Sequence, residues 1–442
     1  MKKFFLLFTL ALAFIACENQ LGQTPETDMI HLWPASDSTG LYGYINEKGK
    51  MVIPAQFDYA YGFSCGKAKV RFDNFRYAFI DQQGNILHTF SEGEECDSYF
   101  YYGCCRLYKF MLTARGFDTA PVAMIDDNFN ILFQADSPSR YYAKLNPMTK
   151  DGLALSNYGY YNKKGEIIFP HKNDSNHYYN CADFCDGIAV YSTWWKDATI
   201  HTNYGAFNTK GEFVIDTLYS FLQSVGCNRL VYRLKTEGID PLYGLMDTEG
   251  NIITEPFIAK YTDDFGFYGD GGLLPVKADF RGKSGYIDKN GTWIIPAQYD
   301  YAYPFYEGVA WVTNVNESWK LIDLKGNVVL ALDDVAKQPN EMFHNGLCLI
   351  NDFTNKQYMY INKQGEVIYC WSKKSSNKQT NAPEKSDPSS FDYFCRHRVL
   401  SISRTMCPQP PKIIGKRCGM IRLAYWADSE PTVSRRSRLR KG

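Results

Sequence analysis

Histidine is scarce in this chain of 442 residues, which has seven, at positions 31, 88, 171, 177, 201, 344 and 397. None of them belongs to a His-Glu-x-x-His sequence, in which two His side chains on one helical turn bind zinc. The recurring Asp and Asn residues also lack the density of acidic ligands that a calcium loop needs. We therefore expect no metal and no cofactor, and a protein that is not an enzyme.

Long apolar runs are also lacking. Beyond residue 16 no stretch approaches the 18 consecutive apolar residues of a membrane-spanning helix. The net charge is zero over the whole chain, but residues 371–442 hold 16 Lys and Arg against 5 Asp and Glu. The remaining residues therefore carry a net charge of −11, which argues against nucleic acid as a partner, because nucleic-acid binding needs a basic surface.

The first residues, MKKFFLLFTLALAFIACENQ, have the layout of an export signal. Two lysines precede a 13-residue apolar stretch (residues 4–16), which is too short to span a bilayer. The ending Phe-Ile-Ala-Cys resembles the bacterial lipoprotein signal, in which lipid is attached to the cysteine. That resemblance implies a signal peptide over residues 1–16, a lipid-bearing Cys17, and a tether over residues 17–28. The alternative is an ordinary signal peptide followed by an incidental cysteine.

A lipid on Cys17 would place the protein in the bacterial cell envelope, at the outer membrane or facing the periplasm, with the cell surface as an alternative. Twelve further cysteines could form disulfides in an exported protein, but the sequence leaves their pairing open. Cys181 and Cys185 lie near two histidines, yet their spacing matches no standard zinc site. We expect these cysteines to be buried or disulfide-bonded.

One segment of 24 residues occurs twice in the chain. Residues 43–66 and 285–308 are identical at 14 of 24 positions. Its centre, Gly-Tyr-Ile-Asp/Asn-x-x-Gly, recurs in weaker form along the chain. The Asp or Asn of the nine copies stands at positions 46, 81, 126, 162, 208, 247, 288, 323 and 362.

Each copy predicts three strands, one before the motif, one on it and one after it. Asp/Asn-x-x-Gly is the chemistry of a tight hairpin turn, and the prolines at 54, 170 and 296 are expected to end the third strand. One such meander cannot bury its apolar face alone, whereas a stack of them can. We predict an all-β fold, a tandem array of about nine three-stranded meanders, either an open curved solenoid or a propeller-like ring. Because no unit is split between the chain ends, the open array is slightly favoured.

The stretch Gly-Tyr-Ile-Asp-Lys-x-Gly-x-Trp-Ile-Ile-Pro at 285–296 resembles the WG repeat family of bacterial proteins. The family usually has Trp-Gly at the start of its motif, whereas this chain has Tyr-Gly, as at Tyr42-Gly43. The resemblance extends over about residues 29–370 and implies β-rich repeats in exported proteins. It transfers no catalytic residue, and it implies a scaffold that binds a protein or an envelope component.

Two groups of aromatic residues could make contacts. Tyr59, Tyr61 and Phe63 recur in phase with Tyr301, Tyr303 and Phe305, which favours packing but leaves stacking on sugar rings open. Trp194 and Trp195 are adjacent, so an extended backbone would turn one ring outward. They are the candidate contact patch. The alternatives to the scaffold are therefore a carbohydrate-binding module and a hydrolase with an unrecognised site.

The domain organisation follows from these patterns. The WG-like β-repeat array is expected over residues 29–370. Residues 371–442 lack the motif, the alternation and the apolar density of the array, so a basic, disordered tail is expected there.

Overall fold

The computed structural model describes residues 31–72, 76–113, 116–134, 145–170, 178–196, 200–234, 242–259, 267–278 and 282–372. They all lie within a compact unit of residues 1–407. Apart from one 3-10 turn, η3 (Asp270–Gly272), the elements of these ranges are β-strands, which confirms the all-β prediction.

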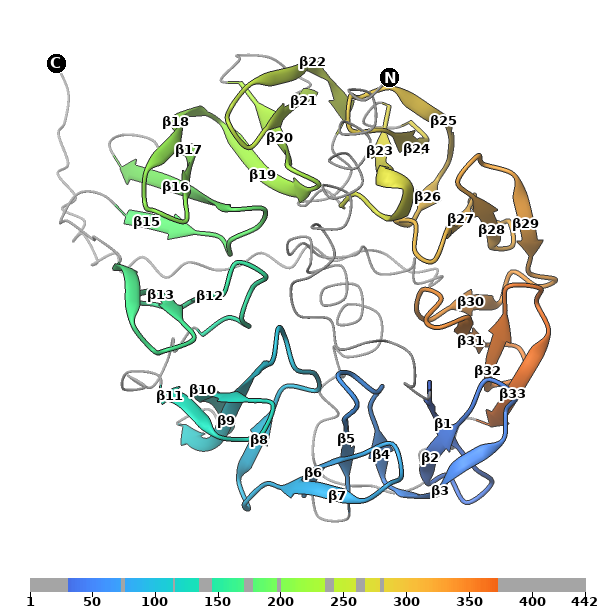
Figure 1. The fold of residues 1–442 in the computed structure, drawn as a ribbon. Coiled ribbons are helices and arrows are strands. Elements are labelled where there is room, and N and C mark those ends of the chain that lie inside the picture. Colours follow the sequence, from blue (N-terminus) through green and yellow to red (C-terminus); the bar gives the residue numbers. More distant parts are fainter. Residues whose placement is uncertain are drawn as a thin grey trace, which may run out of the picture. The chain divides into compact units, whose positions relative to one another are not determined.

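The strands form antiparallel sheets in which neighbours in the chain are neighbours in the sheet (Figure 1). Those of the first half are β1 (Trp33–Ser36), β2 (Tyr42–Ile45) and β3 (Met51–Phe57); β4 (Tyr59–Ala60), β5 (Ala68–Arg71), β6 (Tyr77–Ile80) and β7 (Ile86–Thr89); β8 (Glu94–Cys96), β9 (Cys104–Thr113), β10 (Gly116–Asp126) and β11 (Ile131–Gln134); β12 (Leu153–Leu155), β13 (Gly159–Asn162) and β14 (Ile167–Pro170); and β15 (Tyr178–Cys181), β16 (Ile188–Lys196), β17 (Ile200–Asn208) and β18 (Phe213–Tyr219).

The second half begins with a seven-stranded sheet and ends with two four-stranded ones. They are β19 (Phe221–Gly226), β20 (Arg229–Arg233), β21 (Leu242–Asp247), β22 (Ile252–Ala259), β23 (Leu274–Lys277), β24 (Ser284–Ile287) and β25 (Trp293–Tyr299); β26 (Tyr301–Ala302), β27 (Val309–Thr313), β28 (Lys320–Asp323) and β29 (Val328–Ala331); and β30 (Lys337–Pro339), β31 (Leu347–Asp352), β32 (Gln357–Asn362) and β33 (Val367–Ser372). One residue pair, Ala259 with Lys277, joins β22 to β23, so the large sheet consists of two meanders. The last strand also runs two residues past position 370, the expected end of the array.

Most sheets contain one strand more than predicted. The additional strand comes from the connection between units, which the sequence presents as a loop carrying aromatic plugs. In the two best-matched copies it is the short β4 and β26, paired with β5 and β27. Alternation of Tyr with small or polar residues in these segments suits a pleated edge, which explains the added strand.

The predicted hairpin turns are present at all nine motif positions. At each one the residue three places after the Asp or Asn donates its amide to that residue's backbone carbonyl, over 2.9–3.2 Å. At Asp288 the carboxylate also accepts the amides of Asn290 (2.9 Å) and Thr292 (2.8 Å). The repeated acid or amide is therefore a turn former, because its side chain replaces backbone partners that the tight turn leaves open.

The prediction that Pro54 and Pro296 end the third strand is wrong. β3 and β25 both continue past the proline, and their pairing with β2 and β24 shifts register nearby. These are outer strands with one unpaired edge, where a missing N–H removes no ladder hydrogen bond. A Cβ on Gly43 would stand 2.3 Å from the Ile53 carbonyl oxygen, so the irregular course of β3 requires glycine at this position.

Neighbouring units are tied together by the motif tyrosine. Its hydroxyl donates to a backbone carbonyl in the first strand region of the following unit. The pairs are Tyr44 with Tyr61 (2.8 Å), Tyr160 with Ala182, Tyr286 with Tyr303 (2.7 Å), and Tyr360 with Pro34 (3.1 Å). In the last pair the following unit is the first unit of the chain.

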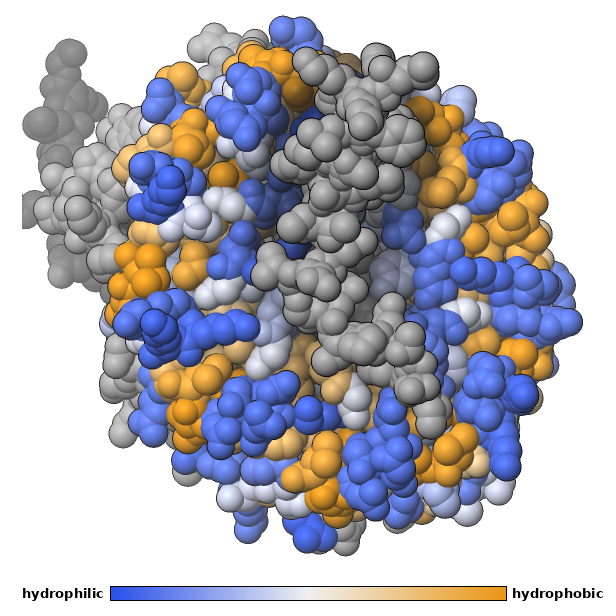
Figure 2. All heavy atoms as spheres, viewed as in Figure 1, coloured by the Kyte–Doolittle hydropathy of each residue, from blue (hydrophilic) through white to orange (hydrophobic). Residues whose placement is uncertain are grey.

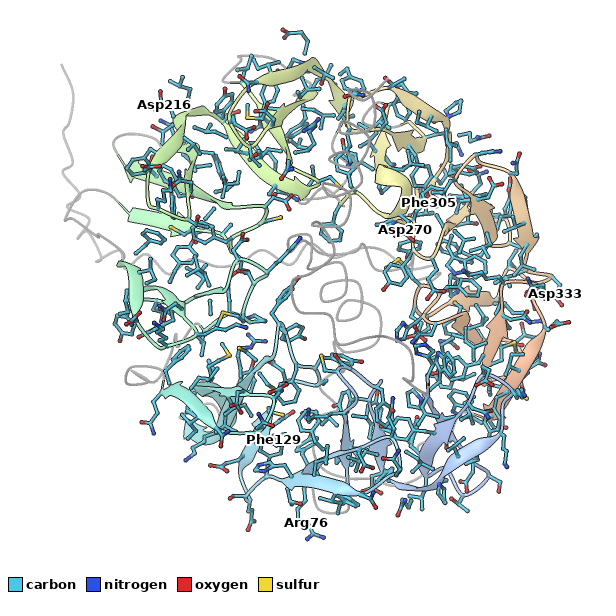
Figure 3. The ribbon with its side chains drawn as sticks, in the orientation of Figure 1. Arg76, Phe129, Asp216, Asp270, Phe305 and Asp333 are labelled. Carbon is cyan, nitrogen blue, oxygen red and sulfur yellow. The ribbon has the colours of Figure 1, made fainter. Side chains whose placement is uncertain are left out.

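A second set of links lies at tight turns near the start of the units. A carboxylate in one unit accepts a backbone amide from the corresponding turn of another. These links are Asp151 to Gly187 (3.1 Å), Asp186 to Asn228 (2.8 Å), Asp270 to Gly308 (3.0 Å), and Glu307 to Gly346 (3.0 Å). Figure 3 shows Asp270 next to Phe305, whose carbonyl accepts the Asp270 amide.

The first and last sheets contact each other. Trp33 and Ile45 share one buried cluster with Leu347 and Tyr360. The indole nitrogen of Trp33 donates to the His344 carbonyl over 3.0 Å, across 311 positions of sequence. Figure 1 shows β33 beside β1–β3. We call this contact region, between β1–β3 and β30–β33, the seam.

Candidate functional site

The residues predicted to form a site, Cys17, Trp194 and Trp195, have no side chain in the described part of the chain. Cys17 lies outside the described residues. Trp194 and Trp195 lie in β16, where their backbones pair with Thr202 and His201, but their side chains are outside the described residues. The extended backbone that we assumed for the two tryptophans is therefore present, while the role of their rings stays a prediction.

The described cysteines are free thiols. This holds for Cys181 and Cys185, and it leaves the expected disulfides without a described example. Among the described residues no group of three or more His, Cys, Asp or Glu side chains could hold a metal ion. A search of the same residues finds no helix of the length and apolarity needed to cross a membrane.

Residues 62–66 read Gly-Phe-Ser-Cys-Gly, which has the spacing of a serine nucleophile elbow. The structure does not support that role. Ser64 sits in a tight turn between β4 and β5, where it exchanges backbone hydrogen bonds with Lys67, and a strand rather than a helix follows. The Ser64 hydroxyl points to the Cys65 sulfur at 3.9 Å.

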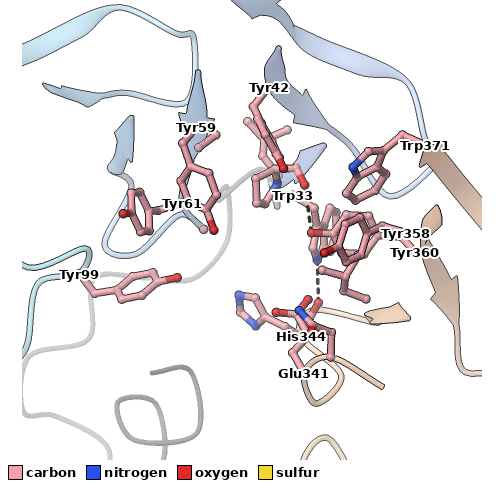
Figure 4. A pocket seen from close by; sticks show the side chains of 16 residues that line it. Trp33, Tyr42, Tyr59, Tyr61, Tyr99, Glu341, His344, Tyr358, Tyr360 and Trp371 are labelled. Carbon is pink, nitrogen blue, oxygen red and sulfur yellow. Dashed lines mark hydrogen bonds between the residues drawn. The ribbon is translucent and has the colours of Figure 1, made fainter. Parts of the chain in front are cut away.

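A cavity of about 230 Å³ opens at the seam. Figure 4 shows the side chains that surround it, which come from three sheets and from connections between strands, among them Tyr99 between β8 and β9. Tyr42 and Tyr59 belong to the first and second sheets, and Tyr358 and Trp371 to the last. The lining is Leu32, Trp33, Pro34, Tyr42, Tyr59, Ala60, Tyr61, Gly62, Tyr99, Asn340, Glu341, His344, Leu349, Tyr358, Tyr360 and Trp371.

Aromatic rings make up the walls, and they hold one another in place. On one side Tyr59 contacts Tyr42 at 5.3 Å between centroids and Tyr61 at 4.9 Å. On the other side Trp371 contacts Tyr358 at 5.6 Å and Tyr360 at 5.7 Å. Tilted and edge-on rings at these separations attract each other. These contacts between wall residues hold the cavity in shape without a ligand.

Glu341 is the one acidic side chain of the lining, and the lining includes no Lys or Arg. Its side chain is half-buried just after β30. Burial raises the pKa of the carboxyl to about 8, although a hydrogen bond from the Leu349 backbone acts in the opposite direction. An ionised carboxylate is therefore costly here unless a cation joins it.

His344 forms the floor beside Glu341 (Figure 4). It is buried, and its carbonyl accepts a hydrogen bond from the indole N–H of Trp33. Its ring nitrogen Nε2 lies 3.1 Å from the side-chain nitrogen Nδ2 of Asn345. The backbone of His344 is thus part of the seam's own hydrogen bonding, and this fixes the floor of the cavity.

Two cations contact tyrosines of the lining without lining the cavity themselves. Lys69 is buried, donates to Glu95 at 2.8 Å and to the Cys96 carbonyl at 2.7 Å, and lies 5.2 Å from the centre of the Tyr61 ring. Arg71 lies 5.7 Å from the centre of the Tyr59 ring. Both cations therefore belong to the supporting structure and are not part of the lining.

Sequence reasoning missed most of this site. It placed Tyr59 and Tyr61 in the repeat and favoured packing over contact, whereas the structure leaves both half-buried at the cavity. Glu341 and His344 lie outside the motif, so no repeat pattern marks them. The one available signal was Trp371 directly after position 370, the predicted end of the array, and the structure places it within β33. The wall itself forms only when residues about 300 positions apart meet.

A second kind of exposed surface follows the outer strands. Apolar side chains that follow the hairpin turns are exposed there: Val52, Ile86, Ile131, Ile168, Ile252, Ile294, Val328 and Val367. Figure 2 shows apolar groups alternating with hydrophilic ones around the face in view. Small, separated apolar groups are ordinary on a soluble surface and mark no site by themselves.

Comparison with known proteins agrees with the predicted resemblance to the WG repeat. A family model described as the WG containing repeat matches residues 42–74, 158–174 and 285–319, which supports a relation to WG repeat proteins. No curated protein matches the chain.

Among solved structures, one titled "Crystal structure of the eukaryotic initiation factor" has a TM-score of 0.52 and 10% identity, covering 78% of this chain and 96% of that one. BamB from Moraxella catarrhalis has a TM-score of 0.35 at 10% identity, covering 60% and 88% of the two chains. The C-terminal WD40 domain of Sif2 has a TM-score of 0.32 at 11% identity, covering 62% and 81%. The first of these is similar in fold; none of the three indicates a function. The chain is thus an all-β repeat protein, and three of its segments match the WG repeat.

Proposed function

We propose that this chain is an exported binding scaffold, anchored in the bacterial cell envelope by lipid on Cys17, and that the seam cavity is its binding site. In this proposal the described sheets form a closed propeller-like ring of nine units. The contacts of Trp33 and Tyr360 between the first and last sheets support closure. The single observation that carries the proposal is a pre-formed aromatic cavity where those sheets meet.

The cavity has the properties of a binding site. Its walls combine aromatic rings, most of them tyrosines, with the polar side chains of Asn340, Glu341 and His344, and aromatic walls with a few placed polar groups are usual in ligand pockets. Its position also matters, because surfaces contributed by three separate sheets converge there. A partner that fills it would contact residues from both ends of the described chain.

The lining favours binding over hydrolysis. A glycoside hydrolase uses two carboxyl groups on either side of the scissile bond. The lining has one, Glu341, and the Gly-Phe-Ser-Cys-Gly stretch forms no nucleophile elbow. The carbohydrate-binding alternative keeps support from the tyrosine rings at the cavity and from the Trp194–Trp195 pair, which lies on an extended strand.

The anchor is tested by membrane fractionation of full-length protein made in bacteria. We expect the wild type in the membrane fraction and a Cys17→Ser variant in the soluble fraction, because lipid attachment needs the thiol. Membrane retention of the variant at the wild-type level would overturn the lipid anchor.

The binding site is tested by retention of an envelope partner after crosslinking. We expect Tyr358→Ala to lower retention severalfold and Leu218→Ala to leave it unchanged, because Leu218 is 66% exposed on β18 and is not part of the lining. Equal retention by both variants would overturn the assignment of the seam as the binding site.

A further inference from the structure

We propose that the seam cavity takes a small organic cation, an alkylammonium group held between the aromatic walls and the Glu341 carboxylate. This inference rests on the proposed function of the seam as a binding site and adds the class of ligand. Three properties of the cavity carry it: the ring faces, the charge of the lining and the size.

The rings surround the cavity from several directions. Tyr42, Tyr59 and Tyr61 come from one side, and Tyr358, Tyr360 and Trp371 from the other (Figure 4). The face of an aromatic ring is negative, and an ammonium group enclosed by such faces is stabilised by about 0.5–1 kcal/mol at exposed sites and about 2 kcal/mol or more when desolvated. A neutral ligand gains the packing of these rings but not this electrostatic attraction.

Two of these rings already contact cations of the protein itself. Lys69 and Arg71 lie 5.2 and 5.7 Å from the centres of the Tyr61 and Tyr59 rings, and neither cation is part of the cavity lining. These cations are held elsewhere, since Lys69 is paired with Glu95 at 2.8 Å. The cavity side of the same rings faces a lining without Lys or Arg.

Glu341 supplies the complementary charge. It is the lining's one acidic residue, and no salt bridge to it is present in the described part of the chain. A half-buried carboxyl in a low-dielectric setting attracts a cation more strongly than one in water does. The ionised Glu341 carboxylate can therefore pair with a bound ammonium group. This ion pair would offset the loss of hydration that the carboxylate suffers in the cavity.

The size of the cavity favours one small group. Its volume of about 230 Å³ is below the range of about 300–1,000 Å³ that is usual for drug-sized ligands. A trimethylammonium head group fits that volume, whereas a run of sugar rings does not. The size therefore argues for an ammonium group, free or at the end of a larger partner, over an oligosaccharide.

The test is calorimetric titration of the full-length protein at pH 9 with choline and with 3,3-dimethylbutan-1-ol. The second compound has the shape of choline with a carbon in place of the charged nitrogen. We expect choline to bind at least tenfold more tightly. Equal affinities, or tighter binding of the neutral compound, would overturn the proposal, as would binding of N-acetylglucosamine in place of choline.

Variants assign the interaction to the named residues. Glu341→Gln keeps the shape and is expected to lower choline affinity at least tenfold, while Glu249→Gln, at an exposed turn, is the matched control and should change nothing. Tyr358→Phe should retain binding and Tyr358→Leu should lose it, because the ring face and not the hydroxyl holds the cation. An unchanged affinity in Glu341→Gln would overturn the proposal. The comparison of choline with its neutral analogue needs no variant, so it stands even if a substitution unfolds the protein.

The pH dependence gives an independent readout. If only the ionised carboxyl binds, the ionised fraction at a pKa of about 8 predicts about tenfold tighter binding at pH 9 than at pH 7. The other titratable groups that line the cavity are His344 and six tyrosines (Tyr42, Tyr59, Tyr61, Tyr99, Tyr358 and Tyr360), and the Cys348 thiol lies beside Glu341. Burial raises the pKa of Cys348, Tyr358 and Tyr360 above their ordinary values of 9 and 10, so Glu341 accounts for the change, and His344→Gln should keep it. A flat profile in the wild type would overturn the proposal.

The two proposals can fail separately. If choline does not bind while partner retention still depends on Tyr358, the ligand class is wrong and the seam remains the binding site. If choline binds but the Tyr358→Ala variant retains the partner, the seam is a cation site and the partner binds elsewhere.

Discussion

At the scale of single residues, tyrosine has two separate uses in this chain. The motif tyrosines, such as Tyr286 and Tyr360, are buried and donate their hydroxyls across unit boundaries. The tyrosines of the connections, such as Tyr59, are half-buried and line the seam cavity. The first use depends on the hydroxyl, which links two units, whereas the second depends on the ring.

Tyr360→Phe removes one inter-unit hydrogen bond without removing the ring. We expect the free energy of unfolding in urea to fall by about 1–3 kcal/mol, because the Pro34 carbonyl is left without this donor. Tyr286→Phe should lose a similar amount, and Tyr158→Phe, at an exposed position, should lose nothing. A Tyr360→Phe protein as stable as the wild type would show that this bond does not hold the seam.

Glu341 makes stability depend on pH. Its folded pKa of about 8 lies above the ordinary carboxyl value of 4.5, so the folded state holds the proton more tightly than the unfolded state. The stability that this proton contributes is complete below about pH 4.5 and is lost as the pH rises towards 8.

Glu341→Gln is therefore expected to be close to the wild type in stability at pH 5, where the carboxyl is protonated. At pH 8.5 the variant should be more stable by on the order of 4 kcal/mol, because an amide carries no desolvated charge. Thermal unfolding at the two pH values measures the difference. A variant that is less stable than the wild type at pH 8.5 would contradict the assigned pKa.

At the scale of elements, the unit is a hairpin turn together with links to its neighbours. The turn was predictable because Asp/Asn-x-x-Gly acts within five residues. The carboxylate links were not, since Asp270 and Gly308 are 38 positions apart and neither belongs to the motif. The additional strands, such as β4, and the continuation of β3 past Pro54 were missed for a similar reason. Edge strands tolerate proline and irregular pairing that central strands do not.

Asp270→Ala tests one inter-unit link. We expect a loss of about 0.5–1.5 kcal/mol in the free energy of unfolding and faster hydrogen exchange at the Gly308 amide, which loses its acceptor. Asp216→Ala, which changes an exposed acid on β18 (Figure 3), is the control and should alter neither quantity. Unchanged exchange at Gly308 would mean that the link does not form in solution.

At the scale of the whole molecule, periodicity predicted the class of fold but not the contact between its first and last sheets. The number of motif copies and the turn chemistry could be predicted from the sequence. No sequence pattern indicates that Trp33 and His344 are in contact. The slight preference for an open array came from whole units at both ends, and the contacts of Trp33 and Tyr360 oppose it. The cavity was unpredictable for the same reason, because it exists only where the first and last sheets meet.

Trp33→Ala distinguishes a joined seam from an open array. Trp33 is buried between the two sheets, so we expect a loss of about 3–5 kcal/mol in the free energy of unfolding. Hydrogen exchange should accelerate in β33 as well as in β1, and should be unchanged in β16. Acceleration confined to β1 and its chain neighbours would indicate that the sheets are not joined.

The seam as a binding site is tested most directly by a photoreactive amino acid placed at Tyr358 of the full-length protein in its native cells. Our account predicts a defined adduct after illumination at this position, and no such adduct from Leu218 on β18, which is exposed outside the lining. Choline added at a saturating concentration should suppress the adduct. An adduct from Leu218 but none from Tyr358 would contradict the account.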